Sequence, residues 1–92
     1  MFDPLLHQPI RSKLISLLIS NGELPFKALK EFLKVTDGNL SSHLRKLESA
    51  GYVEIEKTYE GKRPKTIIAI SESGEKAFDE YIESLKKFIE EN

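Results

Sequence analysis

The chain has 92 residues, a length that forms one small domain with a single hydrophobic core, and its formal net charge is −1. It contains no cysteine, which excludes disulfide bonds, thiolate metal sites and cysteine nucleophiles. No apolar run is long enough to span a membrane, and the first residues lack the layout of a secretory signal, so we expect a cytoplasmic protein without a membrane partner.

The charges are unevenly distributed along the chain. Residues 1–35 carry five cations and three anions, residues 36–65 carry six and five, and residues 66–92 carry three and seven. The acidic excess therefore lies in the last third, while the first two thirds are mildly basic. This asymmetry indicates two surfaces with different roles, although the total charge is far from that of a basic nucleic-acid binder.

Two helices are expected in the first third of the chain. Residues 9–20 place apolar side chains at the spacing of one buried helix face, and Pro9 suits a first helical turn because it needs no N–H there. Asn21 and Gly22 end this segment. A shorter helix is expected over residues 26–33. The apolar positions of the two helices are Ile10, Leu14, Ile15, Leu17, Leu18, Phe26, Leu29, Phe32 and Leu33.

A third helix is expected over residues 37–50, with Thr36 or Asp37 as its N-cap and Gly51 at its end. Its leucines recur at i, i+4 and i+7, so one of its faces should be buried. These leucines are Leu40, Leu44 and Leu47. About three residues around Val35 join this helix to the preceding one. Two short helices with so tight a joint are typical of a helix-turn-helix that packs on the helix before it.

The opposite face of the third helix is polar and carries no acidic residue. On a helical wheel it comprises Gly38, Ser42, Arg45, Lys46 and Ser49, with Asn39 and Ser41 at its flanks. Glu48 is placed beside the buried side. Hydroxyl, amide and guanidinium groups bind phosphates and base edges, and Gly38 would let a nucleic-acid backbone approach the start of the helix closely. The alternative is that these residues only solvate an exposed face.

After Gly51 the period of the sequence changes from 3.6 to 2, which predicts a β-hairpin. Val53, Ile55, Lys57 and Tyr59 fall on one face of a strand, with Glu54, Glu56 and Thr58 on the other. Residues 60–64 are expected to form a turn and residues 65–71 the returning strand, with Thr66, Ile68 and Ile70 on one side. The tip is basic, with Lys62, Arg63 and Lys65. It could follow a phosphate backbone or reach a minor groove, or it could merely favour solubility.

Residues 72–91 are expected to form the last helix, with Ser71 or Ser73 as its cap. Its apolar stripe is wider than packing on its own domain requires, which predicts a symmetric dimer contact; the alternative is packing within one chain only. Apolar residues near the N-terminus could join this contact. The predicted dimer residues are Phe2, Leu5, Leu6, Phe78, Tyr81, Ile82, Leu85, Phe88 and Ile89.

The chain resembles small winged-helix transcriptional regulators of the MarR/ArsR-like superfamily, and most closely the compact single-domain group common in archaea and some bacteria. The most specific motifs are "DGNLSSHLRKLESAGYV", "GKRPKT" and the "SESG" that opens the last helix, and the resemblance covers residues 7–78. It implies a mainly helical fold in the order helix, helix, helix, strand, strand, helix, with the hairpin over residues 53–71 as a wing.

The resemblance also implies a function, which is binding of double-stranded DNA by a homodimeric regulator, by default a repressor, with the third helix in the major groove. The residues that it would place on DNA are Asn39, Ser41, Ser42, Arg45 and Lys46 of the helix, and Lys62 and Arg63 of the wing. The runner-up is a winged-helix module for protein–protein interaction that does not bind DNA. The near-neutral charge favours that alternative, and the acid-free helix face opposes it.

Enzymatic and metal-dependent functions find little support in the sequence. No nucleophile–base pair, carboxylate dyad or phosphate loop can be assembled from these residues, so we do not expect an enzyme. The only histidines, His7 and His43, are far apart in the chain, and neither a metal nor a cofactor is expected. His43 is expected to pack at the edge of the core or to bond locally. No residue pattern identifies a small-molecule effector.

Overall fold

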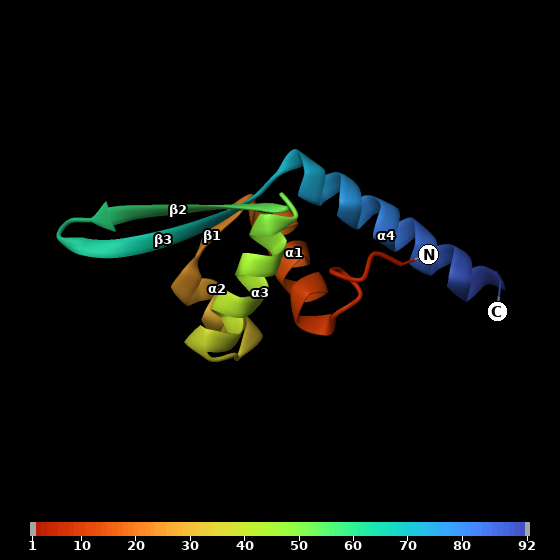
Figure 1. The fold of residues 1–92 in the computed structure, drawn as a ribbon, viewed down its shortest axis with the longest axis horizontal. Coiled ribbons are helices and arrows are strands. Elements are labelled where there is room, and N and C mark those ends of the chain that lie inside the picture. Colours follow the sequence, from red (N-terminus) through yellow and green to blue (C-terminus); the bar gives the residue numbers. More distant parts are fainter. Residues whose placement is uncertain (1, 92) are drawn as a thin grey trace.

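Four helices and three strands make up the computed structural model, which describes residues 2–91 (Figure 1). They confirm the expected mainly helical fold with a β-hairpin wing. In chain order they are α1 (Pro9–Asn21), β1 (Glu23–Pro25), α2 (Phe26–Leu33), α3 (Asp37–Ser49), β2 (Val53–Glu60), β3 (Arg63–Ile70) and α4 (Glu72–Glu91).

The helices begin and end where local chemistry requires it. Pro9 is in the first turn of α1, and Gly22 ends that helix with φ of 80°, a conformation that side chains disfavour. Of the two expected caps of α3, Thr36 is the one used, because its hydroxyl accepts a hydrogen bond from the N–H of Asn39 at 3.1 Å. Lys34 adopts the left-handed conformation after α2, with φ of 55°, and thereby reverses the chain toward α3.

The hairpin differs from expectation in its turn and gains a third strand. Glu60 pairs with Arg63, so only Gly61 and Lys62 form the turn, whereas the predicted turn over 60–64 is too long. Pro64 is tolerated inside β3 because β1 pairs only with residues 67–69, which leaves that edge of the strand open at Pro64. The sheet order is β1-β3-β2, and both pairings are antiparallel.

A single aliphatic core lies between the helices and the inner part of the sheet. Each of its fully buried leucines contributes about 1.5–3 kcal/mol relative to an exposed position. The core residues are Leu6, Leu14, Ile15, Leu18, Leu29, Leu40, Leu44, Leu47, Val53 and Ile68. Helix α4 supplies only partly buried side chains to this core, among them Ala77, Phe78 and Tyr81.

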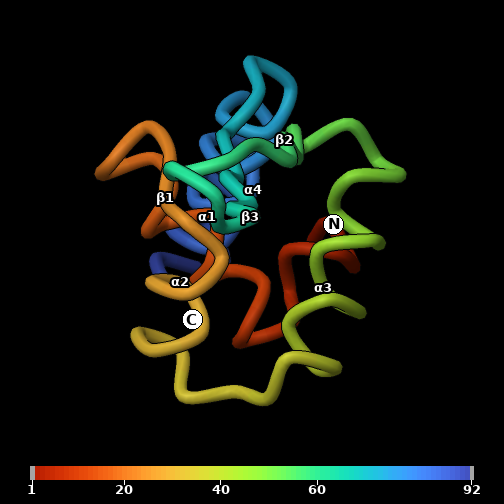
Figure 2. Tube along the Cα trace, turned by 90° about the vertical axis from the view of Figure 1, so that its left-hand side faces the viewer, coloured from red at the N-terminus to blue at the C-terminus, as the bar shows by residue number. Residues whose placement is uncertain are grey.

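The hairpin and α4 leave the helical core at opposite ends, which gives the protein its elongated shape of 54 × 25 × 21 Å (Figure 1). The hairpin, called the wing from here on, comprises β2, β3 and the turn between them. Seen from the tip of the wing, α2 and α3 lie below the strands, joined by their short turn (Figure 2). This arrangement places α3 below the base of the wing (Figure 1).

Candidate nucleic-acid interface

The two faces of α3 are divided as its sequence predicts. Leu40, Leu44 and Leu47 are at most 3% exposed and hold the helix against the core. The predicted polar face is open to solvent except at two serines. Its exposed members are Gly38, Asn39, Arg45, Lys46 and Ser49, and its half-buried members are Ser41 and Ser42.

The acidic residues of α3 lie in two different settings. Asp37, in the first turn, forms an ion pair with Lys30 of α2 at 2.8 Å, which joins the two helices at the surface. Glu48, which was expected beside the buried side, is exposed and lines the groove between α3 and the wing together with Leu44. The polar surface around α3 therefore includes an acidic residue. Among the described residues that line this groove, Glu48 is the only one with a carboxylate.

A shallow groove brings α3 and the wing together. Its helix side carries Ser41, Arg45 and Glu48, and its wing side carries Lys57 and Thr66. Apolar side chains of Phe26, Leu44 and Ile55 complete its lining. Lys57 was not among the predicted contact residues, although the alternation of β2 places it on the same face as Val53 and Ile55. Two cations, two hydroxyls and one carboxylate thus converge here from separate segments.

The pairing of β2 with β3 gives the wing two chemically different faces. Strand alternation places residues that pair with each other on the same face. The inner face continues from the core outward, and its pairs are Val53–Ile70, Ile55–Ile68, Lys57–Thr66 and Tyr59–Pro64. The outer face has the pairs Glu54–Ala69, Glu56–Ile67, Thr58–Lys65 and Glu60–Arg63. All three glutamates of β2 therefore belong to the outer face.

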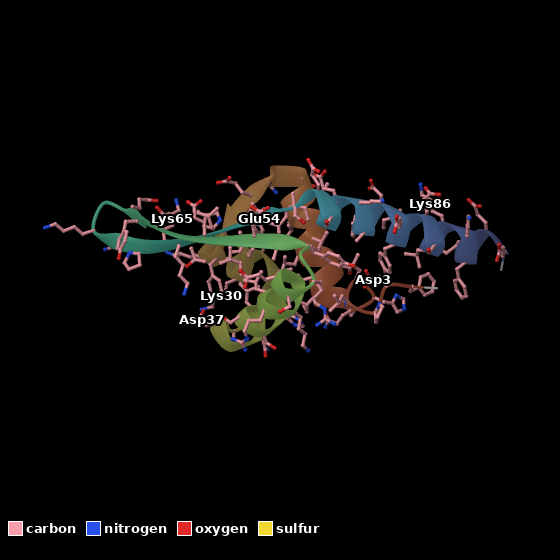
Figure 3. The ribbon with its side chains drawn as sticks, turned by 45° about the horizontal axis from the view of Figure 1, so that its top comes forward. Asp3, Lys30, Asp37, Glu54, Lys65 and Lys86 are labelled. Atoms are coloured by element: carbon pink, nitrogen blue, oxygen red, sulfur yellow. The ribbon has the colours of Figure 1, made fainter. Side chains whose placement is uncertain are left out.

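The three predicted wing cations are consequently not equivalent. Lys62 lies in the turn, whereas Arg63 and Lys65 belong to the outer face of the wing, which also carries the glutamates of β2. Lys65 donates a hydrogen bond to the carboxylate of Glu60 at 2.7 Å, and this bond lowers the pKa of Glu60. Figure 3 shows Glu54 and Lys65 along the wing, and Lys30 and Asp37 at the helices. The three cations expected at the tip are therefore accompanied by the carboxylate of Glu60.

The orientation of α3 also depends on a buried arginine that sequence reasoning missed. Arg11 of α1 is only 8% exposed; its Nε donates to the carbonyl of Leu5 at 2.7 Å, and its guanidinium lies 3.1 Å from Nδ1 of His43. Burial, together with the positive charges of Arg11 and Lys46, lowers the pKa of His43. Neutral His43 therefore accepts the bond from Arg11, and the contact ties α1 to the middle of α3. Bonding by His43 was expected, but with a partner nearer in the chain.

A second candidate surface lies on α4, away from the wing. Phe32 of α2 and Ile89 of α4 are 64% and 65% exposed. A groove between α1, α2 and α4 is lined by Ser12, Lys13, Ser16, Leu17, Phe32, Leu33, Phe78, Tyr81, Ile82 and Leu85. Leu6 was predicted at the dimer contact, but it is fully buried in the core of its own chain and has no surface to offer a partner.

The N-terminal segment lines the same end of the molecule. Phe2 stacks on His7 at 4.7 Å between ring centroids and meets Tyr81 and Phe88 edge-on. His7 Nδ1 lies 3.0 Å from the hydroxyl of Tyr81. Leu5, the remaining residue predicted from this segment, is half-buried. These contacts hold residues 2–7 beside α4 within one chain.

Residues 2–91 contain no group of three or more histidine, aspartate or glutamate side chains placed to hold a metal ion. None of the helices in that range combines the length and the apolar composition needed to cross a membrane.

Known proteins are similar to this chain in both sequence and fold. A family model described as "winged helix DNA-binding domain" matches residues 10–89. An uncharacterized protein of Methanocaldococcus jannaschii is 47% identical over 73 residues, which cover 79% of each chain. The structure of a transcriptional regulator homologue from Pyrococcus horikoshii is 32% identical, covers 94% of this chain and 85% of its own, and superimposes with a TM-score of 0.88.

More distant solved structures share the fold. A MarR-family regulator from Silicibacter pomeroyi matches 90% of this chain and 55% of its own, with 20% identity and a TM-score of 0.71. An ArsR-family regulator matches 96% of this chain and 86% of its own, with 19% identity and a TM-score of 0.62. The chain thus shares the fold of MarR-family and ArsR-family regulators, as the resemblance implied.

Proposed function

This chain belongs to the winged helix DNA-binding domain family, and we propose that it is a homodimeric, sequence-specific regulator of transcription that binds double-stranded DNA. The observation that carries this proposal is the groove between α3 and the wing, where Arg45 and Lys57 converge with the hydroxyls of Ser41 and Thr66. Cations and hydroxyl donors in one concave surface suit a duplex whose phosphates pass between a helix and a hairpin.

Helix α3 is the proposed reader of base sequence in the major groove. A helix fits the width of that groove, and an exposed guanidinium such as Arg45 can pair in two places with a guanine edge. Asn39, Ser41, Ser42 and Lys46 lie on the same polar face and would bind bases or neighbouring phosphates. Gly38 has open space around its Cα, which leaves room for a phosphate at the start of the helix.

Phosphate contacts would supply most of the affinity. Lys57 on the inner face and Lys62 in the turn of the wing are the proposed wing contacts, and the outward-facing Arg63 and Lys65 are placed second to them. Since each neutralised phosphate releases a counterion, affinity should fall steeply as salt rises. Repression by occupying a promoter is the simplest way in which such binding would regulate transcription.

The proposed dimer is formed through α4 and the groove beside it. Phe78, Tyr81, Ile82 and Leu85 line that groove or its rim, and Ile89 is exposed further along the helix. Two chains related by a two-fold axis would present their α3 helices to successive major grooves, with half-site centres about 10 base pairs apart. Sedimentation of the full chain and of Ile89→Glu tests this contact: the wild type should be a dimer and the variant should dissociate. A monomeric wild type would contradict it.

DNA binding is tested by fluorescence anisotropy on a duplex selected from random sequences, at about 50 and about 200 mM salt. Arg45→Ala should weaken binding and also change the base preference, because Arg45 is the proposed base reader. Lys57→Ala should weaken binding to all duplexes and lower the slope of log affinity against log salt by about 1. Lys86→Ala is the matched control, since it removes an exposed cation from α4, far from the wing (Figure 3).

The same assay separates this function from the runner-up, a winged-helix module for protein–protein interaction. The net charge of −1 and the glutamates on the outer face of the wing favour a protein partner. Absence of salt-dependent binding to any duplex would support that function and would reject the DNA-binding regulator. Equal effects of Lys57→Ala and Lys86→Ala would reject the placement of the duplex between α3 and the wing.

A further inference from the structure

The inner face of the wing ends in an aromatic residue that is largely exposed to solvent. Tyr59 pairs with Pro64 across the hairpin, and this is the outermost pair of the inner face. Tyr59 is 72% exposed, more than any other large hydrophobic residue among those the structure describes. Tyr59 therefore contributes little to the core, and its ring is available for a contact outside its own chain.

The position of Tyr59 separates it from the proposed dimer surface. Exposed apolar side chains of α2 and α4, such as Phe32 and Ile89, belong to or adjoin the groove beside α4. Tyr59 lies near the tip of the wing, and the wing and α4 extend from opposite ends of the core (Figure 1). Contact between α4 helices therefore does not account for its exposed ring.

The charged residues nearest to Tyr59 on the inner face of the wing are cations, which favour a polyanion as a partner. Lys57 and Thr66 form the next pair inward on the same face, and Lys62 lies in the turn beyond. The inner face of the wing carries no carboxylate among its paired residues, because Glu54, Glu56 and Glu60 are all on the outer face. The carboxylate that faces Lys57 and Thr66 comes from Glu48 of α3, nearer the core than Tyr59. An apolar ring between two lysines, on a face whose own paired residues include no acid, fits a sugar–phosphate backbone better than an acidic or purely apolar protein surface.

We propose that Tyr59 is a DNA-contacting residue of the wing. Its ring packs with Pro64 against deoxyribose at the edge of the minor groove, while Lys57 and Lys62 contact the phosphates on either side. The inference rests on the proposed DNA-binding function and extends it with an apolar contact. Apolar side chains from proteins that enter minor grooves pack on sugars and bases in this way, and the phenol hydroxyl can donate to the acceptors that A·T pairs expose there.

This contact has a distinctive dependence on salt. Tyr59 neutralises no phosphate, so its removal should lower affinity without changing the number of counterions released. Loss of its buried ring surface should weaken binding about tenfold at every salt concentration. Removal of Lys62 should instead lower the slope of log affinity against log salt by about 1, so that its effect shrinks as salt rises.

The experiment compares wild type, Tyr59→Ala, Tyr59→Phe and Lys62→Ala by anisotropy on the selected duplex over a series of salt concentrations. For Tyr59→Ala, the line of log affinity against log salt should run parallel to that of wild type at lower affinity. The affinity of Tyr59→Phe should stay within about threefold of wild type because this variant keeps the ring. Because Tyr59 is largely exposed, the thermal unfolding of Tyr59→Ala should match that of wild type. Binding of Tyr59→Ala within twofold of wild type at all salts would overturn the inference.

A second readout makes the failure of this inference distinguishable from failure of the proposed function. The chain contains no tryptophan, so Tyr59→Trp gives a single emission signal at the wing. Saturating duplex should shift and quench that emission. If wild type binds the duplex and the emission stays unchanged, Tyr59 does not touch DNA, although the regulator function stands. If wild type binds no duplex, both fail. A change of sedimentation in Tyr59→Ala would assign the ring to a protein contact and also overturn the inference.

Discussion

The junction between the wing and α4 makes a sharp prediction at Gly74. A Cβ atom added to Gly74 would overlap the carbonyl oxygen of Tyr52 and lie 2.8 Å from Cδ1 of Ile70. The Tyr52 carbonyl cannot retreat easily, because it accepts a hydrogen bond from the N–H of Ser71 at 3.1 Å. The hydroxyl of Ser71 in turn donates to the carbonyl of Gly51 at 2.6 Å and accepts from the N–H of Gly74.

Gly74→Ala therefore forces backbone apart at a place where hydrogen bonds hold it together. Overpacking costs about 1–3 kcal/mol, and loss of the Ser71 bond adds about 1 kcal/mol. Alanine recovers about 1 kcal/mol through its better helix propensity. The net loss should be about 2 kcal/mol, which corresponds to a fall in melting temperature of about 8–16 °C for a domain of this size.

The matched control is Gly38→Ala, the same substitution in another helix. Gly38 lies in the first turn of α3, has no positive φ, and has no atom within 4 Å of the position that an added methyl group would take. This variant should gain about 0.5–1 kcal/mol in the free energy of unfolding. Urea unfolding followed by circular dichroism, at one fixed protein concentration, measures both. Gly74→Ala within about 0.5 kcal/mol of wild type would refute the close packing of α4 on Tyr52.

Three further predictions concern single side chains. The bond that Tyr52 donates to the carboxylate of Asp3 raises the tyrosine pKa from 10.0 to about 12, so its stabilisation is present below pH 10 and lost as pH rises toward 12; ultraviolet titration against Tyr52→Phe measures it. The pKa of His43 is lowered from 6.5 by burial and by Arg11, so stability should fall as pH drops below 6.5, and an NMR pKa at or above 6.5 would contradict this. Glu48→Gln should tighten duplex binding about threefold in anisotropy, because it removes a carboxylate that repels phosphate, whereas weaker binding would indicate a base contact.

The order of the main elements was predictable because each carries its own periodic signal. Leucines at Leu40, Leu44 and Leu47 mark the buried face of α3, and alternation after Gly51 marks the wing. Strand β1 was missed because three residues, Glu23–Pro25, are too few to display an alternation. The predicted turn of the wing is too long because proline favours turns, whereas Pro64 lies within β3. Its place there depends on the edge of β3 that β1 leaves open.

Tertiary contacts decided what the sequence could not. Leu6 is apolar and near the N-terminus, which suits a dimer contact, but the path of the N-terminal segment places it in the core. An arginine such as Arg11 is expected at the surface. Its bonds to the carbonyl of Leu5 and to His43 make its burial possible without a carboxylate partner. Neither outcome follows from a periodicity, since both depend on which distant segment lies opposite the side chain.

The low net charge of the chain is compatible with DNA binding once charges are assigned to faces. Along β2 the acidic residues Glu54, Glu56 and Glu60 take the outer face, and Lys57 takes the inner face beside Arg45 of α3. Helix α4 carries most of the acidic residues of the range 66–92, and it extends from the core on the side opposite the wing (Figure 1). At moderate salt, screening limits the range of each charge to about 10 Å. A duplex between α3 and the wing would therefore interact with the nearby cations, and the net charge of the whole chain would matter little. Exchanging Lys57 with Glu56 should therefore weaken duplex binding although the net charge stays the same.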